Sequence, residues 1–399
     1  MDLFQKCRQF SRAKEIIDAG VFPYFQVIEE NHGPVVRMEG REVIMAGSND
    51  YLGLSQHPEV IEASVKAVES FGSSCSGSRY LNGTSILHTS LEKELADFLG
   101  VEACLAFTTG YLTNQGVIPT LVQKGEYLIS DKENHASIVT GAWIARARGA
   151  HVLRYKTNDM TALEDILKSV PPDAPKLIVT DGVFSMSGRI VNLPGLVKLA
   201  KAYGARVMID EAHAMGVLGR GGRGTCSHFG LRNGPDVELT MGTFSKSFAS
   251  LGGFIAGERR VIDYIKYNSQ AFIFSASMAP GNVAAVRASL AIIRREPERI
   301  ERLRRIADEI REGLKNQGFK LMEGGTPILP VIIGDDMMTF RFWRRLLEEG
   351  VFVNAVVSPA VPQGLQLIRL SLIATYEQKH IDGILGAFHK VGKEFDLIE

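Results

Sequence analysis

Short apolar runs alternate with longer amphipathic stretches through the middle of the chain. Most of the runs are separated by stretches with helical spacing, which predicts strands joined by helices. Parallel neighbours need such crossover connections, so the pattern favours an α/β fold with a mainly parallel, seven-stranded sheet. The seven predicted strands are residues 103–107, 126–130, 151–154, 176–180, 205–210, 238–242 and 252–256.

The two ends of the chain follow different patterns. A helical arm to about residue 20 precedes an alternating segment, 35–45, which predicts a hairpin with Glu-Gly at its turn. An Arg- and Glu-rich stretch, 283–317, predicts one long helix with a solvated face. Beyond it, short strands (329–333, 351–353, 366–371) mix with helices (338–349, 377–393). We therefore expect an N-terminal arm and hairpin (1–57), a large α/β domain (58–282) and a smaller α+β C-terminal domain (283–399).

Composition narrows the possible partners and compartments. Among 399 residues, Lys plus Arg and Asp plus Glu both number 45, so no nucleic-acid or polyanion partner is indicated. The four cysteines are scattered without a CxxC motif, which predicts neither a disulfide framework nor a metal site. The N-terminus has no signal-peptide core, and no segment reaches the roughly 18 apolar residues of a membrane span. We expect a cytoplasmic protein without a membrane span.

Lys246 and Asp210 indicate the chemistry. Lys246 stands between small hydroxyl residues and between two predicted strands, a position that suits an imine with an aldehyde cofactor. Asp210 ends a β-branched apolar run, and ligands of open α/β sheets lie at the carboxyl ends of strands. A carboxylate there can pair with a protonated pyridine nitrogen. Although most lysines are merely solvated surface charges, the pair together predicts pyridoxal 5'-phosphate as cofactor.

The cofactor phosphate has a candidate site where a predicted strand passes through Gly110 into a helix. Backbone amides at a helix N-terminus bind phosphate, and glycine lets the backbone approach it. Gly110 and Tyr111 are candidates for this contact, with the hydroxyls of Thr243 and Ser245 opposite them. An ordinary strand-to-helix turn is the alternative.

Three further side chains suit the cofactor ring. His135 begins a helix just after a strand and could stack on the ring, although a capping or core histidine is about as consistent with its local sequence. His213 lies three residues after Asp210 and could bind the phenolic oxygen, as could Ser185. Arg369 lies in an alternating apolar strand, where a substrate α-carboxylate offers a planar bidentate partner. A salt bridge to a protein acid is the alternative for Arg369.

The chain resembles the α-oxoamine synthases, fold-type I pyridoxal phosphate enzymes that condense an amino acid with an acyl-CoA and release carbon dioxide. The resemblance covers almost the whole chain. It is carried by Gly47-Ser-Asn-Asp-Tyr-Leu-Gly-Leu54, Gly77-Ser-Arg-Tyr-Leu-Asn-Gly-Thr84, Asp181-Gly-Val-Phe-Ser-Met, Asp210-Glu-Ala-His, Gly242-Thr-Phe-Ser-Lys and the Arg369 strand. It implies the fold-type I architecture, with helices on both faces of the sheet.

The resemblance also implies roles for these residues. Lys246 would form the Schiff base and act as acid and base at Cα, while His135 would stack on the ring. Asp210 would pair with the pyridinium, His213 and Ser185 would hold the phenolic oxygen, and Arg369 would bind the substrate carboxylate. Asn49 would line the substrate pocket. The active site would lie at a homodimer interface, where Ser275 would reach the phosphate of the partner subunit.

Within the family, Phe274-Ser-Ala-Ser-Met-Ala-Pro280 and Asn354-Ala-Val-Val-Ser-Pro-Ala-Val-Pro362 resemble members that use L-serine and a long-chain acyl-CoA. The expected reaction is a decarboxylating Claisen condensation. A member using glycine or alanine with another acyl-CoA is the leading alternative. A fold-type I aminotransferase is a further one, and Lys246 argues against a non-catalytic subunit.

Overall fold

The computed structural model describes residues 2–399, apart from the side chain of Arg12. The chain divides into two compact units. The larger unit holds residues 49–304 and 324–326, and the smaller unit holds the N-terminal segment to Ser48 together with 305–323 and 327–399. The expected boundary at 282 and 283 falls inside a helix of the larger unit.

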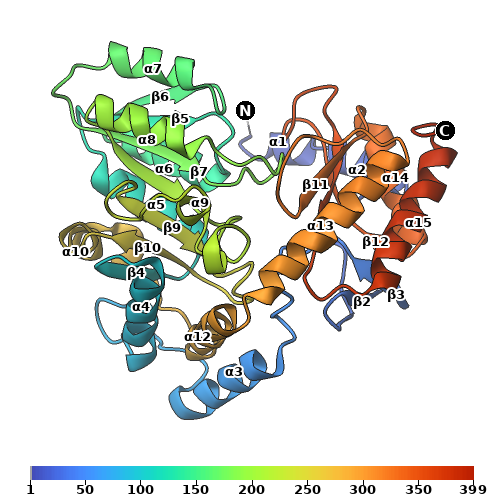
Figure 1. Ribbon diagram of the computed structural model, residues 1–399, viewed down its shortest axis with the longest axis horizontal. Helices are drawn as coiled ribbons and strands as arrows, with labels where there is room; N and C mark the ends of the chain where they lie inside the picture. The colour runs from blue at the N-terminus through green and yellow to red at the C-terminus, as the bar shows by residue number, and fades with distance from the viewer. Residues whose placement is uncertain (1) are drawn as a thin grey trace. The chain divides into compact units, whose positions relative to one another are not determined.

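The larger unit is built on a seven-stranded sheet (Figure 1). Its order is β4-β10-β9-β8-β7-β5-β6, and β10 alone is antiparallel to its neighbours, so the predicted α/β class and mainly parallel sheet are confirmed. All seven predicted strands form, each within a residue or so of its expected bounds. They are β4 (Ala103–Phe107), β5 (Tyr127–Asp131), β6 (His151–Tyr155), β7 (Lys176–Asp181), β8 (Arg206–Asp210), β9 (Leu239–Thr243) and β10 (Gly253–Gly257).

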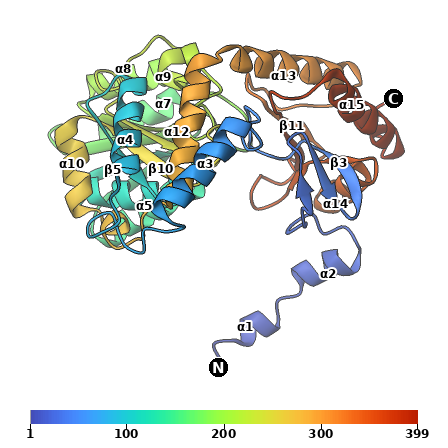
Figure 2. The same ribbon diagram turned by 90° about the horizontal axis from the view of Figure 1, so that it is seen from below.

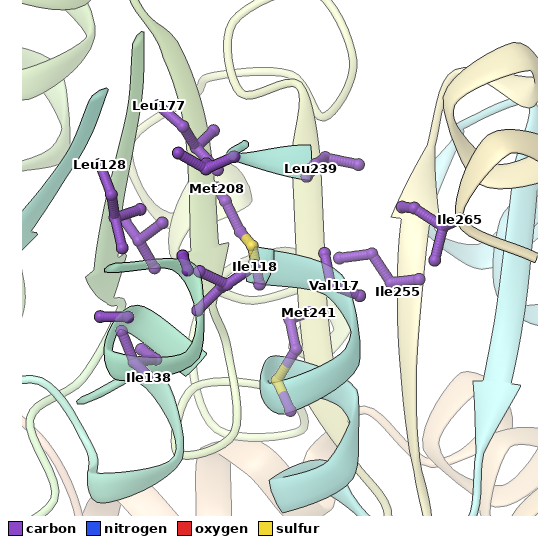
Figure 3. Packing of buried hydrophobic residues seen from close by; sticks show 14 of the residues in the cluster. Val117, Ile118, Leu128, Ile138, Leu177, Met208, Leu239, Met241, Ile255 and Ile265 are labelled. Carbon is purple, nitrogen blue, oxygen red and sulfur yellow. The ribbon is translucent and has the colours of Figure 1, made fainter. Parts of the chain in front are cut away.

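Helices cover both faces of this sheet because successive apolar side chains along a strand point to opposite faces. On one face, Leu177 and Met208 pack with Val117 and Ile118 of α5 (Gly110–Leu121) (Figure 3). On the other face, Ile178 and its neighbours pack against α7 and α8, which lie side by side in Figure 1. The helices of the two faces are α6 (Ala136–Ala147), α10 (Arg259–Asn268) and α11 (Gln270–Ile273) with α5, and α7 (Met160–Ser169), α8 (Leu193–Ala202) and α9 (Thr225–His228) opposite them.

A second helical group in the larger unit contains α3 (Pro58–Phe71), α4 (Ile86–Leu99) and α12 (Pro280–Arg295). Figure 2 shows α3 and α12 side by side. The single long helix predicted at 283–317 is wrong. Two helices form instead, because Pro297 cannot continue the backbone hydrogen bonds of α12, and α13 (Glu298–Asn316) starts directly after it.

The smaller unit contains two sheets. The predicted hairpin forms as β2 (Val35–Met38) and β3 (Arg41–Met45), with Glu39 and Gly40 both at positive φ in the turn. The first sheet runs β1 (Glu30–Asn31), β2, β3, β12 (Val351–Phe352), and the second runs β11 (Ile328–Ile332), β14 (Leu367–Ser371), β13 (Asn354–Val356). The helices wholly within this unit are α1 (Gln5–Arg8), α2 (Arg12–Asp18), α14 (Asp336–Glu348) and α15 (Gln378–Glu394), and residues 305–316 of α13 also belong to it.

The helices described between residues 2 and 399 include none that is both long enough and apolar enough to cross a membrane.

Candidate active site

The carboxyl ends of the parallel strands in the larger unit surround a cavity of about 230 Å³. In open α/β sheets this edge is where ligands bind, since the helices begin there with their unpaired amides. Eight of the residues predicted from the sequence line the cavity, although they come from four separate segments of the chain. They are Gly110, Tyr111, His135, Asp210, His213, Thr243, Ser245 and Lys246.

Lys246 occupies the turn between β9 and β10, as the flanking apolar runs predict. The turn is closed by backbone hydrogen bonds from the amide of Phe244 to the carbonyl of Gly252 and from the amide of Ala249 to the carbonyl of Lys246 itself. The Lys246 side chain is half-buried at the cavity wall. A rigid turn thus holds a primary amine at the cavity.

Two carboxyl groups lie side by side at the sheet edge. Asp181 ends β7 and Asp210 ends β8, and the two residues are directly paired in the parallel register. Both are buried. Burial, reinforced by the nearby Asp210 carboxylate, raises the pKa of Asp181 well above its usual range, whereas Lys246 opposes this effect. Oδ1 of Asp181 has no hydrogen-bond partner among residues 2–399, so the site has unused acceptor capacity beside the lysine.

His135 stands at the N-cap of α6, a role that its sequence position allowed as an alternative to ring stacking. Its Nδ1 accepts a hydrogen bond from the Ser137 amide, and its own amide donates to Oδ2 of Asp181. Desolvation by the surrounding protein, together with Lys246, lowers the pKa of His135, and Asp210 acts against this. The Tyr111 ring meets the imidazole edge-on at 6.3 Å between centroids. The cap therefore also presents the ring to the cavity.

His213 is held by a tyrosine. Its Nδ1 lies 2.7 Å from the Tyr51 hydroxyl, and both side chains are buried. The same hydroxyl lies 3.3 Å from Oδ1 of Asn49. Asn49 is thus connected to the cavity through Tyr51 and His213, because the Asn-Asp-Tyr segment lies beside the strand end that carries Asp210.

The Gly110 end of the cavity has the features of an anion site. Thr109 caps α5 by accepting a hydrogen bond from the Leu112 amide, which leaves the first amides of a twelve-residue helix at the cavity. A Cβ on Gly110 would lie 2.8 Å from Oγ1 of Thr243, so a side chain there would meet the β9 end. Thr243 Oγ1 lies 3.0 Å from the Ser245 hydroxyl, which adds two further polar groups.

Four predicted residues are not part of the cavity lining, namely Asn49, described above, and Ser185, Ser275 and Arg369. Ser185 is buried in the loop after β7, while Val183 of the same loop lines the cavity. Ser275 is half-buried after α11 and lines a separate small hollow with Arg79. Arg369 belongs to the smaller unit, where it is buried on β14 and donates to the Ser371 hydroxyl at 2.6 Å.

Several polar residues at the site were missed from the sequence. They are Tyr51, Asn114, Ser137 and Asp181, all buried in the larger unit. Tyr51 and Asp181 fall in motifs that carry the family resemblance, and Asp181 ends an apolar run just as Asp210 does. That shared position was a usable signal for Asp181. Asn114 and Ser137 lie within helical stretches, where only the packing of α5 against α6 shows their role.

A larger cavity, about 930 Å³, lies at the opposite edge of the same sheet. Its lining includes the first residues of three parallel strands, namely Lys176, Arg206 and Leu239. None of the predicted cofactor or substrate residues lies there. The smaller cavity therefore remains the candidate active site, since it joins an amine, two carboxyl groups and a helix N-terminus.

The chain is similar to known proteins over nearly its whole length. The family model for aminotransferase class I and II matches residues 41–388. A serine palmitoyltransferase of Bacteroides ovatus is 44% identical over 99% of both chains, and an 8-amino-7-oxononanoate synthase of Thermoanaerobacter pseudethanolicus is 40% identical over 97% of both. A solved serine palmitoyltransferase from S. paucimobilis with a bound PLP–myriocin aldimine covers both chains fully, with a TM-score of 0.96 and 35% identity. The chain belongs to the class I and II aminotransferase family and, within it, to the α-oxoamine synthases.

Proposed function

We propose that this α-oxoamine synthase is a serine palmitoyltransferase. It condenses L-serine with palmitoyl-CoA and yields 3-oxosphinganine, CoA and CO2. The observation that carries the proposal is the convergence of Lys246, Asp210 and His135 on one cavity, in a chain 44% identical to a serine palmitoyltransferase along its length.

The cavity fits pyridoxal 5'-phosphate at both ends. The first amides of α5 with Gly110 and Tyr111 suit the phosphate, aided by the hydroxyls of Thr243 and Ser245. The buried carboxyl pair at the other end suits a ring that carries a protonated nitrogen, because Oδ1 of Asp181 has no hydrogen-bond partner among residues 2–399 and Asp210 is buried beside it. When bound, the cofactor withdraws electrons from the amino acid Cα.

Side chains of the protein hold the cofactor and transfer the proton. The amine of Lys246 tethers the cofactor and moves the proton at the serine Cα. Asp210 keeps the ring nitrogen protonated, and His135 stacks on the ring. His213, held by Tyr51, binds the phenolic oxygen together with Ser185.

Substrate recognition uses two further residues. The guanidinium of Arg369 clasps the serine carboxylate until carbon dioxide leaves. Asn49 lines the amino acid pocket, with its side chain steadied by the Tyr51 hydroxyl.

The proposal includes a homodimer with shared active sites in the cytoplasm. Apolar side chains on α3 are spaced along one face and stay exposed, namely Ile61, Val65 and Val68 at 43–51%. Phe274, next to Ser275, is 82% exposed. A second copy would cover such apolar surface and would bring Ser275 to the phosphate of its partner. The described cysteines are all free, which agrees with a reducing compartment.

The runner-up function is another α-oxoamine synthase that uses glycine or alanine with a different acyl-CoA. The 40% identity to an 8-amino-7-oxononanoate synthase favours it as the nearest competitor. A fold-type I aminotransferase would consume an oxo acid and would release no thiol.

The test is a matrix of amino acids and acyl-CoAs. Purified protein is supplied with L-serine, glycine or L-alanine, each with acetyl-, pimeloyl- or palmitoyl-CoA, and thiol release is followed against the Lys246→Ala variant as blank. We expect the highest kcat/KM for L-serine with palmitoyl-CoA. If alanine with a pimeloyl thioester is the better pair, the palmitoyltransferase proposal fails while the family membership stands.

A further inference from the structure

A series of hydrogen bonds, here called the relay, links Asp210 to His135 through Asn114 and Ser137. Asp210 and His135 are the two residues that would flank the cofactor ring. Oδ2 of Asp210 accepts from Nδ2 of Asn114 at 2.8 Å, and the same Nδ2 donates to the Ser137 hydroxyl at 2.9 Å. The Ser137 hydroxyl lies 2.8 Å from Nδ1 of His135. Asn114 and Ser137 are fully buried at 0% and 1% exposure, so water does not compete for these contacts.

The directions of the hydrogen bonds are fixed by counting donors. The Asn114 amide gives one hydrogen to Asp210 and the other to Ser137, whereas the flipped amide would set its carbonyl oxygen against a carboxylate. The Ser137 oxygen thus accepts from Asn114, which leaves the hydroxyl hydrogen for His135 Nδ1. The Ser137 backbone amide, 3.3 Å away, also donates to Nδ1.

Two donors facing Nδ1 determine the state of the imidazole. Nδ1 must be unprotonated, because a hydrogen there would meet the Ser137 amide hydrogen and leave the hydroxyl hydrogen without an acceptor. The ring proton is then on Nε2, and the ring is neutral. The lowered pKa of His135 agrees with this state.

We propose that Asn114 and Ser137 are positioning residues, which hold Asp210 as a carboxylate and His135 as the neutral Nε2–H tautomer. Asp210 receives hydrogen bonds at both oxygens, from Asn114 and from the Ala212 amide at 2.9 Å, so both oxygens act as acceptors, as those of a carboxylate do. A neutral His135 adds no positive charge beside a protonated ring. The relay thus keeps one anionic and one neutral residue beside the cofactor ring.

One observation indicates that position 114 holds an asparagine because of the relay and not for packing alone. Its Oδ1 is buried and has no hydrogen-bond partner among residues 2–399. An unmet buried acceptor is destabilising, so a purely structural site would favour an apolar residue. The orientation that satisfies Asp210 and Ser137 is kept despite this loss.

This inference rests on the pyridoxal phosphate site of the proposed function, but not on which amino acid or acyl-CoA reacts. The test therefore begins without cofactor or substrate. Cofactor-free protein labelled with ¹⁵N-histidine is compared by NMR as wild type, Ser137→Ala and Asn114→Ala, with His135→Gln identifying the signal. We expect a pure Nε2–H tautomer in the wild type. The two relay variants should show a tautomer mixture and a higher imidazole pKa.

Matched controls separate positioning from stability. Asn233→Ala removes a buried asparagine whose carbonyl accepts from Thr240 and whose amide donates to the Leu99 carbonyl, far from the cavity lining. Ser289→Ala removes a buried hydroxyl within α12. Both controls should leave the His135 tautomer and the dissociation constant of pyridoxal phosphate unchanged. Asn114→Ala and Ser137→Ala should raise that constant on the order of tenfold, the usual effect of one lost hydrogen bond.

Two results would overturn the proposal: an Nδ1–H tautomer in the wild type, or relay variants that match the controls in both tautomer and cofactor affinity. If Asn114→Ala does not fold, Ser137→Ala alone decides, since it removes only one oxygen atom. A pure Nε2–H tautomer that the relay variants lose, in an enzyme that prefers glycine, would leave this inference intact while the proposed substrate fails.

Discussion

Glu211 offers a direct test of how the strand end that carries Asp210 is stabilised. The side chain is fully buried, and its carboxyl oxygens accept from the Thr225 amide at 2.8 Å and the Thr225 hydroxyl at 2.7 Å. A Cβ on Gly182 or on Gly224 would lie 2.8 Å from the carboxyl group, so two glycines give it room. Burial raises the pKa of Glu211 to about 7, and the neighbouring Asp210 adds to this while the hydrogen bonds to Thr225 oppose it.

The raised pKa predicts a pH-dependent stability with a definite sign. The folded state holds the Glu211 proton more tightly than the unfolded state, whose pKa is near 4.5. The contribution is therefore complete below pH 4.5 and is lost as the pH rises to about 7. At about 1.4 kcal/mol per pH unit, the free energy of unfolding falls by roughly 3 kcal/mol across this range on account of Glu211.

The substitution Glu211→Gln removes the titration and keeps the shape. Urea unfolding of cofactor-free protein is followed by circular dichroism at pH 5, 6, 7 and 8. From pH 5 to pH 8, the free energy of unfolding of the variant should rise relative to that of the wild type by roughly 3 kcal/mol. Thr225→Val removes a hydrogen bond that favours the charged form, so its stability should fall more steeply with pH. Glu62→Gln, on the exposed face of α3, serves as the control and should run parallel to the wild type. Parallel curves for Glu211→Gln and the wild type would refute the reasoning.

Four predictions concern the reaction itself. Borohydride should fix the cofactor to Lys246 alone, as peptide mapping would show, and Lys246→Ala should keep its fold but lose turnover; a label on another lysine would contradict the assignment. Asp210→Asn should lower kcat by orders of magnitude, whereas its free energy of unfolding should fall by only roughly 1.5 to 3 kcal/mol. Near-normal turnover would show that Asp210 is structural. Arg369→Lys should raise KM for serine, because an ammonium lacks the planar fork; an unchanged KM would remove Arg369 from the site. Thiol release with serine should rise steeply with acyl length, at roughly 0.8 kcal/mol per buried methylene, and a flat series from acetyl to palmitoyl would argue against an apolar chain channel.

The large sheet could be predicted because its strands are short apolar runs separated by helices. β7 and β8, for example, each have three consecutive apolar residues at the centre, 177–179 and 207–209, and these are buried although they point to opposite faces of the sheet. The charge pattern is continuous across the break between α12 and α13 and does not indicate it, whereas Pro297 marks its position. β13 is only three residues long, which is too short for an alternating pattern to identify it, although it pairs with the next strand, β14.

The active site likewise contains residues that the sequence pattern reveals and residues that only the packing reveals. Lys246 and Asp210 could be found because each stands at the end of an apolar run with a chemical group that such a position rarely carries. Asn114 and Ser137 could not, since a polar residue inside a helical stretch is ordinarily solvated. Only the packing of α5 against α6 brings their side chains together beside β8.

Strand order decides what the cavity requires of its ligand. Nothing in the individual runs specifies that β7 lies beside β8, yet this pairing sets the carboxyl groups of Asp181 and Asp210 next to each other. Two neighbouring buried acids favour proton uptake unless cations face them, and the raised pKa of Asp181 reflects this. Lys246 supplies one positive charge, but it is also the amine that would hold an aldehyde cofactor, so it would not serve the carboxyl pair alone. A ligand that brings its own N–H cation to the carboxyl pair therefore complements the site better than a neutral aldehyde would, and the pyridinium of pyridoxal phosphate has this property.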